Sequence, residues 1–314
     1  MKNSQRQLCN SVVMVRPHDF GFNEQTGLDN EFQHRPSKVE QTSLRKTVFD
    51  EFDNSIAQLE SVGIEVLVLE KQHSEKRLPD AIFPNNWFST RENGELIIYP
   101  MKTQNRQDEV QIPQLCDLLE NAHYNISQVS DLREQLSTDK VLEGTGSLIF
   151  HHPSHRVFAA ISERCQKQPL AEYCDKYHYQ SIDFETASSN NSPIYHSNVL
   201  MSCGENFAVL CDQVVTGKNR KVLLNGLLEC VDDLIIISED QMSSNFCGNI
   251  LQLKDANQQP VIAMSKSAYD GFSLQQKKRL ENHGSLAICE IPTIERIGGG
   301  STRCMLAENF LNKN

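Results

Sequence analysis

Short apolar runs alternate with helical stretches along the whole chain. The first run, residues 12–15, is typical of a buried strand. Apolar residues then recur at three- and four-residue steps over 44–59, which predicts one face of a helix that Gly63 ends. Residues 64–69 are apolar again and are predicted to form a second strand.

The same alternation continues towards the C-terminal end. Further strands are predicted at 96–99, 147–150, 157–161, 199–201, 207–211, 234–237, 250–253, 261–264 and 286–288, and further helices at 115–119 and 274–282. The regular return of strand pairs with one helix between them indicates a repeated αβ unit. Because no Gly/Ser- or Pro-rich linker divides the chain, we predict an α/β protein in which residues 1–314 form a single catalytic domain.

Composition and charge are those of a globular protein that does not bind polyanions. Hydrophobic residues make up 39% of the 314 residues and charged residues 23%, as in folded chains. The 30 basic and 41 acidic residues leave a formal charge of −11, which would repel a phosphate backbone or an anionic membrane. We therefore expect no nucleic-acid or membrane partner. Since no apolar signal segment or run near ~18 residues occurs, a cytoplasmic location is predicted.

The ten cysteines are spread from Cys9 to Cys304, and several lie inside apolar runs. This distribution is typical of reduced thiols that pack as small hydrophobic side chains. No pair has the CxxC spacing of a zinc ribbon or a thioredoxin-type site, so we expect no metal.

The C-terminal region contains a glycine run followed by a cysteine. Three consecutive glycines at 298–300 are typical of a backbone with positive φ or of close approach to a ligand. Cys304, four residues after the run and next to Arg303, is expected to be an exposed thiolate of lowered pKa. The alternative is a flexible loop before a buried cysteine in the last strand, and this segment alone favours neither.

Ten histidines compete for the role of the base that cysteine chemistry requires. His196 lies among polar residues where a buried strand is predicted to begin, although a lone histidine there is more often structural. The group His151, His152 and His155 invites a metal site, but Pro153 argues against the helix that would align it, so we predict solvated turn histidines.

Glu143 lies beside two glycines at a predicted strand edge. It is suited to hold a cationic substrate or to orient the histidine, and the alternative is an exposed turn residue. Asn85 and Asn86 precede Trp87, the only tryptophan, and form either a plain turn or neutral hydrogen-bond partners for a small polar ligand.

In this order the segments resemble the guanidine-modifying, or pentein, superfamily, which includes arginine deiminases, dimethylarginine hydrolases and amidinotransferases. The resemblance runs nearly end to end and is closest to the citrulline-utilisation hydrolase (citrulline ureidase) type. Its most specific segments are residues 79–87, 143–147, 163–164, 196–198 and 298–305. It implies a five-fold pseudosymmetric α/β propeller, a substrate in the central channel and no cofactor.

The resemblance also implies roles for individual residues. Cys304 matches the family nucleophile, His196 the general acid/base and Glu143 the carboxylate that binds substrate nitrogen. Arg164 falls on the arginine that helps to hold the substrate α-carboxylate, and Arg106 matches more loosely.

Two positions depart from the deiminase pattern. The aspartates that hold a guanidinium cation, one just after the segment that begins at Phe83 and one two residues after the histidine, are here Asn86 and Asn198. Each lost charge-assisted contact is worth roughly 1.5–3 kcal/mol against about 1 for a neutral one. We therefore assign Phe83, Asn86 and Asn198 to substrate binding. We expect a neutral ureido substrate such as citrulline, or a guanidine whose cation is held by Glu143 alone.

The resulting prediction is a cysteine-dependent hydrolase that converts citrulline to ornithine, ammonia and carbon dioxide through a covalent Cys304 adduct. Arginine deiminase-like, dimethylarginine hydrolase-like and amidinotransferase activities are the alternatives, and a non-catalytic binding protein of the same fold is an alternative of another class. The expected partner is a small molecule, and a homo-oligomer is left open.

Overall fold

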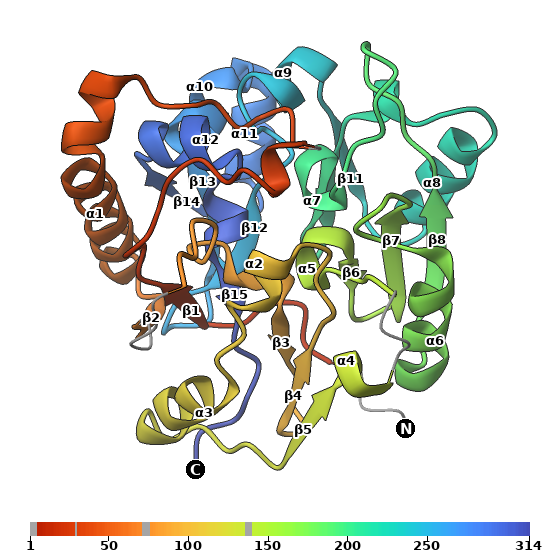
Figure 1. Ribbon diagram of the computed structural model, residues 1–314. Coiled ribbons are helices and arrows are strands. Elements are labelled where there is room, and N and C mark those ends of the chain that lie inside the picture. The colour runs from red at the N-terminus through yellow and green to blue at the C-terminus, as the bar shows by residue number, and fades with distance from the viewer. Residues whose placement is uncertain (1–4, 29, 71–75, 136–139) are drawn as a thin grey trace.

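The described part of the chain contains five three-stranded sheets that share the same strand arrangement. The computed structural model describes residues 5–28, 30–70, 76–135 and 140–314 (Figure 1). In each sheet the first strand pairs antiparallel with the middle strand, which pairs in parallel with the third. The parallel pair is joined by a helical crossover, as parallel pairing requires. This is the repeated αβ unit that the sequence pattern predicts.

The strands are given in the order first, middle and third for each sheet. They are β15 (Ala307–Glu308), β1 (Ser11–Val15) and β2 (Glu65–Leu69); β3 (Phe88–Thr90), β4 (Glu95–Ile98) and β5 (Gln128–Asp131); β6 (Ile149–His151), β7 (Arg156–Ala160) and β8 (Gln180–Phe184); β9 (Met201–Cys203), β10 (Phe207–Leu210) and β11 (Asp233–Ile236); and β12 (Leu251–Lys254), β13 (Pro260–Ser265) and β14 (Ser285–Cys289).

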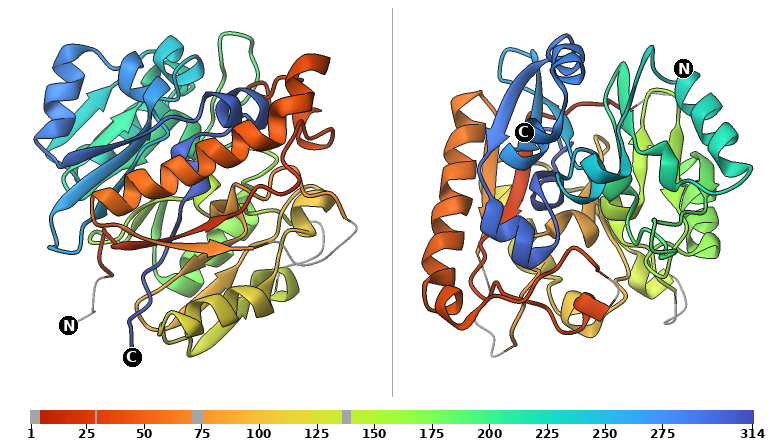
Figure 2. Two further views of the ribbon diagram at one scale, coloured as in Figure 1. Left: turned by 90° about the vertical axis from the view of Figure 1, so that its left-hand side faces the viewer. Right: turned by 90° about the horizontal axis from the view of Figure 1, so that it is seen from above.

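The helices differ in length. The longer ones are α1 (Lys38–Ser61), α3 (Ile112–Asn121), α6 (Lys167–Tyr177), α8 (Asn219–Leu228), α10 (Lys266–Gly271), α11 (Leu274–Glu281) and α12 (Pro292–Gly298). The short ones are η1 (Thr26–Leu28), η2 (Pro84–Asn86), α2 (Gln104–Gln107), α4 (Leu132–Gln135), α5 (Gly144–Ser147), α7 (Ser197–Leu200), η3 (Asp212–Val214), α9 (Glu239–Ser243) and α13 (Thr302–Met305). Helices α1, α3, α6 and α8 lie at the periphery in Figure 1, and α1 runs along the outer face in Figure 2.

The C-terminal strand closes the ring of sheets. β15 pairs antiparallel with β1, so that Val12 faces Glu308 and Val13 faces Ala307. The segment that carries the glycine run and Cys304 is thereby fixed beside the first strand.

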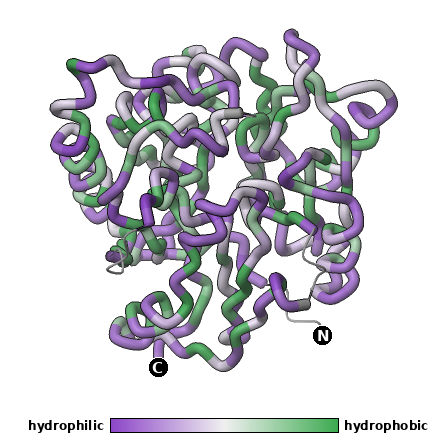
Figure 3. Tube along the Cα trace, viewed as in Figure 1, coloured by the Kyte–Doolittle hydropathy of each residue, from purple (hydrophilic) through white to green (hydrophobic). Residues whose placement is uncertain are grey.

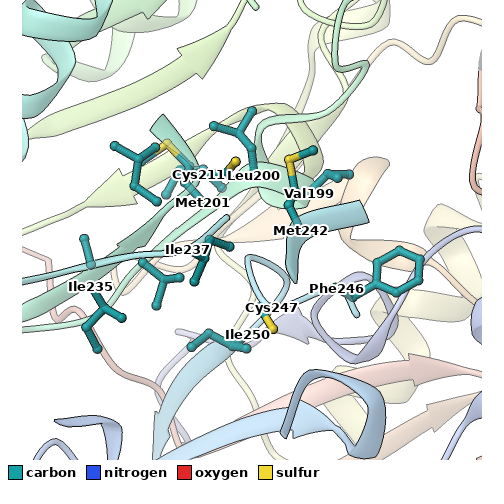
Figure 4. Packing of buried hydrophobic residues seen from close by; sticks show 14 of the residues in the cluster. Val199, Leu200, Met201, Cys211, Ile235, Ile237, Met242, Phe246, Cys247 and Ile250 are labelled. Atoms are coloured by element: carbon teal, nitrogen blue, oxygen red, sulfur yellow. The ribbon is translucent and has the colours of Figure 1, made fainter. Parts of the chain in front are cut away.

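Apolar side chains fill the space between the sheets and their helices. Hydrophobic positions follow the strands, whereas loops and outer helix faces are largely hydrophilic (Figure 3). Around β9, β10 and β11 the buried side chains of Leu200, Met201, Cys211, Ile235 and Ile237 belong to one cluster (Figure 4). Each fully buried aliphatic side chain of this kind contributes about 1.5–3 kcal/mol, so the cluster holds the short turn α7 firmly against its sheet.

Helix α1 shows why the first predictions succeed. Leu44, Val48, Phe52 and Leu59 form its buried stripe, as predicted from their spacing. A capping box fixes its start, and Gly63 follows its end with φ of +83°.

The sequence prediction fails where a strand is preceded by a helical turn. Residues 199–201 belong mostly to α7 and only then enter β9, and the predicted strand at 147–150 begins inside α5. An apolar run has the same composition in a buried strand and a buried turn, so periodicity does not separate them.

The histidine group contains the predicted turn, at residues 152–155, and His155 is half-buried, but the other two histidines are not solvated as we expect. His151 and His152 are buried; the Nδ1 atoms lie 2.7 Å from the hydroxyls of Ser154 and Tyr179, respectively. Burial lowers the pKa of His152 to about 3, so this side chain is neutral at physiological pH. Both histidines therefore serve packing.

The ten cysteines, all within the described residues, are free thiols, in agreement with the prediction. Among the helices that the structure describes, none combines the length and apolarity needed to cross a membrane.

Candidate active site

Five turns meet where the five sheets come together. Each precedes the first strand of a sheet: η2, α5, α7, residues 246–249 and α13. η2 packs against α5 and α13, and α5 packs against α7. The repeated design of the sheets therefore brings five segments far apart in sequence to one place.

The catalytic and amide candidates lie on or beside these turns. Asn86 ends η2, Glu143 and His196 cap α5 and α7, Asn198 lies within α7, and Cys304 lies within α13. All five side chains are buried.

The Glu143 carboxylate is enclosed and has three partners. Its Oε2 lies 2.7 Å from His196 Nε2 and 3.6 Å from Arg164 Nη1. Its Oε1 accepts a hydrogen bond of 3.0 Å from the backbone N–H of Lys102. Both oxygens are thus fixed in direction.

The charges of this pair follow from its surroundings. Burial alone would raise the pKa of Glu143, but Arg164 and the hydrogen bond from His196 outweigh it and lower the pKa to about 2. Burial lowers the pKa of His196, and Glu143 offsets this only in part. Because an ionised carboxylate only accepts, Nε2 of a neutral His196 carries the proton and Nδ1 keeps its lone pair. The arrangement provides a base oriented by a carboxylate.

Cys304 is enclosed rather than exposed. The residue is 6% exposed, and its N–H donates to Ser301 O at 3.0 Å. Burial raises the pKa of its thiol, with Ser301 and Asn249 lowering it by less. The prediction of an exposed thiolate of lowered pKa is therefore wrong. Its neighbour Arg303 donates to Leu306 O and pairs with Glu308 instead of facing the thiol.

Two side-chain amides contact the sulfur. Asn198 Nδ2 lies 3.4 Å and Asn249 Nδ2 3.3 Å from Cys304 Sγ. Asn249 was not among the predicted site residues, because Gly248-Asn249 has the composition of an ordinary turn. The signal lies in the repeat: Asn249 precedes β12 much as Asn198 precedes β9.

Asn86 faces the same centre beside Gly146. A Cβ added at Gly146 would lie 2.1 Å from Asn86 Oδ1 and 3.1 Å from His196 Nδ1, so only glycine leaves room for both side chains. Among the described residues, neither Asn86 Oδ1 nor Asn198 Oδ1 has a hydrogen-bond partner. Each is a buried oxygen suited to accept a bond from a ligand.

Phe83 explains the glycine run. Added Cβ atoms at Gly298 and Gly300 would lie 2.8–2.9 Å from its ring, so these glycines allow the loop to pack directly on the aromatic side chain. Gly299 ends α12 with φ of +62°, and its carbonyl accepts from Tyr195 Oη at 2.9 Å. The run is a tightly packed segment, not a flexible one.

A segment near the N-terminus covers this loop. Gln33 Nε2 donates to Gly298 O at 3.0 Å, and Asn30 Nδ2 donates to Gly299 O at 3.3 Å. Asn23 donates to Asp80 at 2.7 Å. Nothing in the composition of this polar segment marked it as part of the site.

Arg164 connects the buried centre to a cavity. A cavity of about 360 Å³ is lined by Arg164, Ser162, Tyr195 and Gly27, among others. The same guanidinium reaches Glu143 and lies 5.0 Å from the centre of the Tyr195 ring. The cavity carries charges of both signs, because Glu31 and Glu163 line it together with Arg164.

Arg106 does not fit its predicted role of substrate contact. The side chain is buried, and its Nη1 and Nη2 donate to Asp80 O at 2.7 Å and Phe83 O at 2.9 Å. Its Nε lies 3.4 Å from Glu109. These contacts make Arg106 a support of the loop that ends in Asn86.

In the part of the chain that the structure describes, no cluster of three or more His, Cys, Asp or Glu side chains is suited to hold a metal ion.

Comparisons with known proteins give one family match and several structural matches. The model of N,N-dimethylarginine dimethylhydrolase, eukaryotic, matches residues 16–311. No curated protein matches the chain.

Among solved structures, the chain is similar to ArgZ, an arginine dihydrolase from the ornithine-ammonia cycle in cyanobacteria, with a TM-score of 0.71 and 15% identity over 95% of this chain and 40% of that one. The chain thus spans less than half of that protein. The N-terminal domain of ArgZ bound to substrate gives 0.70 and 15% over 95% and 97%. DDAH from Pseudomonas aeruginosa, a cysteine-to-serine mutant with citrulline, gives 0.63 and 11% over 96% and 100%. At these identities the likeness shows the fold, and the predicted pentein propeller is confirmed.

Proposed function

The chain belongs to the N,N-dimethylarginine dimethylhydrolase family, and from this premise we propose that it hydrolyses a C–N bond with Cys304 as nucleophile, His196 as general acid/base and Glu143 as the orienting carboxylate. The chain is thus a pentein-superfamily enzyme of the C–N hydrolase class that acts on guanidino or amidino groups. The observation that carries the proposed roles is the 2.7 Å distance from His196 Nε2 to Oε2 of the ionised Glu143. Both residues lie at the five turns that also include Cys304, and this group of turns is called the ring.

The favoured substrate is a neutral ureido amino acid, most simply citrulline. Glu143 is compensated by Arg164 at 3.6 Å, and His196 is neutral, so these three side chains carry no net charge. Asn86 and Asn198 add none. A guanidinium cation buried here would lack a counter-charge, and an unpaired buried charge is strongly disfavoured.

The ends of the substrate then have different partners. In the cavity beside Tyr195, the α-carboxylate would lie towards Arg164 and the α-ammonium towards Glu31 and Glu163. The ureido group would lie deeper, among the side-chain amides and Cys304. The charged side chains at one end and the neutral amides at the other distinguish the two ends of an amino acid.

In the proposed reaction Nδ1 of the neutral His196 takes the proton of the Cys304 thiol, and the thiolate forms an S–C bond with the ureido carbon, giving a tetrahedral centre. His196 delivers a proton to the terminal nitrogen, the C–N bond breaks, and ammonia leaves an S-thiocarbamate on the cysteine. His196 then takes a proton from water, which adds to the same carbon and displaces the thiolate. The carbamic acid released decomposes to ornithine and carbon dioxide.

The test is turnover of citrulline by wild type, Cys304→Ser and His196→Ala, followed through ammonia and ornithine. Each variant is expected to lose at least a thousandfold in kcat while its thermal unfolding stays that of a folded protein. Asn309→Ala, which removes a buried amide whose Nδ2 lies 3.4 Å from Ser11 Oγ rather than near the sulfur, is the matched control. Wild-type-like ammonia release from either site variant would refute the assignment.

A methylated arginine is the second candidate, favoured by the family match itself. Release of dimethylamine from dimethylarginine, with no ornithine from citrulline, would select it over the ureido substrate. Unmodified arginine is the third arm of this assay, and repeating each with an added acceptor amine separates hydrolysis from amidino transfer.

A further inference from the structure

Asn249 lies at the fifth turn of the ring, where no site residue was predicted. The residue is fully buried and follows Gly248, at which an added Cβ would lie 2.4 Å from Val199 O. Glycine therefore allows the turn to pack directly on the backbone of α7. This close approach carries the Asn249 side chain to the nucleophile.

One N–H of the Asn249 amide donates to a backbone carbonyl, and the other points towards the sulfur. Nδ2 donates to Asn198 O at 2.8 Å and lies 3.3 Å from Cys304 Sγ. An amide nitrogen has two N–H donors, so both bonds can exist together. The bond to a backbone carbonyl fixes the orientation of the amide before any substrate arrives.

In the described part of the chain, the N–H donors of Arg303 and of the neutral His196 have partners other than the sulfur. Arg303 pairs with Glu308 and donates to Leu306 O. His196 directs its Nε2 proton to Glu143. A thiolate formed in this enclosed place must therefore draw its stabilisation largely from neutral donors, and a fixed donor costs no reorganisation when charge develops.

We propose that Asn249 is a catalytic residue that donates a hydrogen bond to the Cys304 thiolate and holds Sγ in place for attack. The inference rests on the proposed function, because it assumes that Cys304 is the nucleophile. Asn198, with Nδ2 at 3.4 Å from Sγ, is the second donor of the pair. The two amides form a neutral cradle for the sulfur, in place of a histidine cation.

The experiment measures the pH dependence of Cys304 alkylation by iodoacetamide, a small neutral reagent, with the modified peptide quantified by mass spectrometry. Asn249→Leu removes the donor at similar volume. Asn249→Asp keeps the shape but replaces the donor with a negative charge. Because a hydrogen bond to a charged group typically shifts a pKa by about one unit, the midpoint should rise by that amount in Asn249→Leu and further in Asn249→Asp.

Alkylation at pH 7 should then fall about tenfold in Asn249→Leu, while the limiting rate at high pH is retained. Asn245→Ala, in the preceding residues, is the matched control, because its Nδ2 donates to Ser267 O at 3.4 Å and not to the sulfur. Thermal unfolding shows whether both Asn249 variants fold. If Asn249→Leu does not fold, the alkylation midpoint of Asn249→Asp still tests the proposal.

Equal midpoints in wild type and both Asn249 variants would overturn the inference and leave Asn249 as a structural residue of the turn. The assay needs no substrate. Shifted midpoints without turnover of any ureido or guanidino compound would uphold the thiolate contact and refute the proposed function instead.

Discussion

An aspartate at position 86 should change the preference of the site from a neutral group to a cation. Asn86 is 5% exposed, and its side chain adjoins Gly146, over which the His196 ring also packs. Glu143 and Arg164 form an ion pair at 3.6 Å. The charges of Glu143 and Arg164 cancel, so Asn86→Asp gives the centre a net negative charge.

The size of the effect follows from two contacts that change together. For arginine, a neutral contact of about 1 kcal/mol becomes a charge-assisted one of about 1.5–3 kcal/mol. For citrulline, a donor to the ureido oxygen is replaced by an acceptor, and an unpaired buried oxygen costs about 1–3 kcal/mol. The sum is about 1.5–5 kcal/mol, so the ratio of arginine to citrulline affinity should rise at least tenfold.

Isothermal titration of both ligands in a Cys304→Ala background measures this ratio without turnover. Asn86→Ala in the same background is the control, because it removes the amide without adding charge. An Asn86→Asp variant that folds but leaves the ratio unchanged, or shifts it towards citrulline, would show that residue 86 does not contact the reacting group.

Three further substitutions test the supports of the site. Burial raises the pKa of Glu295 from 4.5 to about 7, so the stability due to its protonated form is complete below pH 4.5 and is lost as pH rises through 7. Glu295→Gln should therefore raise Tm by about 2–6 °C at pH 8 and by little at pH 5, measured by calorimetry. Arg106→Met should lower the free energy of unfolding in denaturant titrations by about 1–3 kcal/mol for each of the two backbone carbonyls, of Asp80 and Phe83, that lose their buried donor, with KM nearly unchanged. Gly146→Ala should lower kcat for ammonia release at least tenfold while circular dichroism stays native, because the added Cβ displaces Asn86.

The strands and the long helix are predictable because local spacing determines their buried faces. Leu44, Val48 and Phe52 lie on one stripe of α1 whatever surrounds them. The turn α7 is not predictable in this way, because its backbone is set by packing of Val199 and Leu200 against other sheets. Local pattern fails where tertiary contacts decide.

In the site, too, some features are predictable from the sequence and others depend on tertiary contacts. Cys304 and His196 were found through residue type and resemblance, but the burial of Cys304 was not. The segment that leads to Cys304 is packed by Phe83 against the glycine run and by the hydrogen bond from Gln33 to Gly298, contacts that join positions far apart in sequence. Asn249 was missed for the same reason, since its role depends on a contact with another repeat.

The unpaired side-chain oxygens of Asn86 and Asn198 favour a neutral ligand with N–H donors. Asn86 and Asn198 each have a side-chain oxygen without a protein partner among the described residues. A carboxamide has both an acceptor oxygen and a donor nitrogen, whereas a carboxylate only accepts. A guanidinium only donates, so it would match two carboxylates best. A ureido group has one carbonyl oxygen and three N–H donors, and a ring of amides is therefore better matched to it than to a cation.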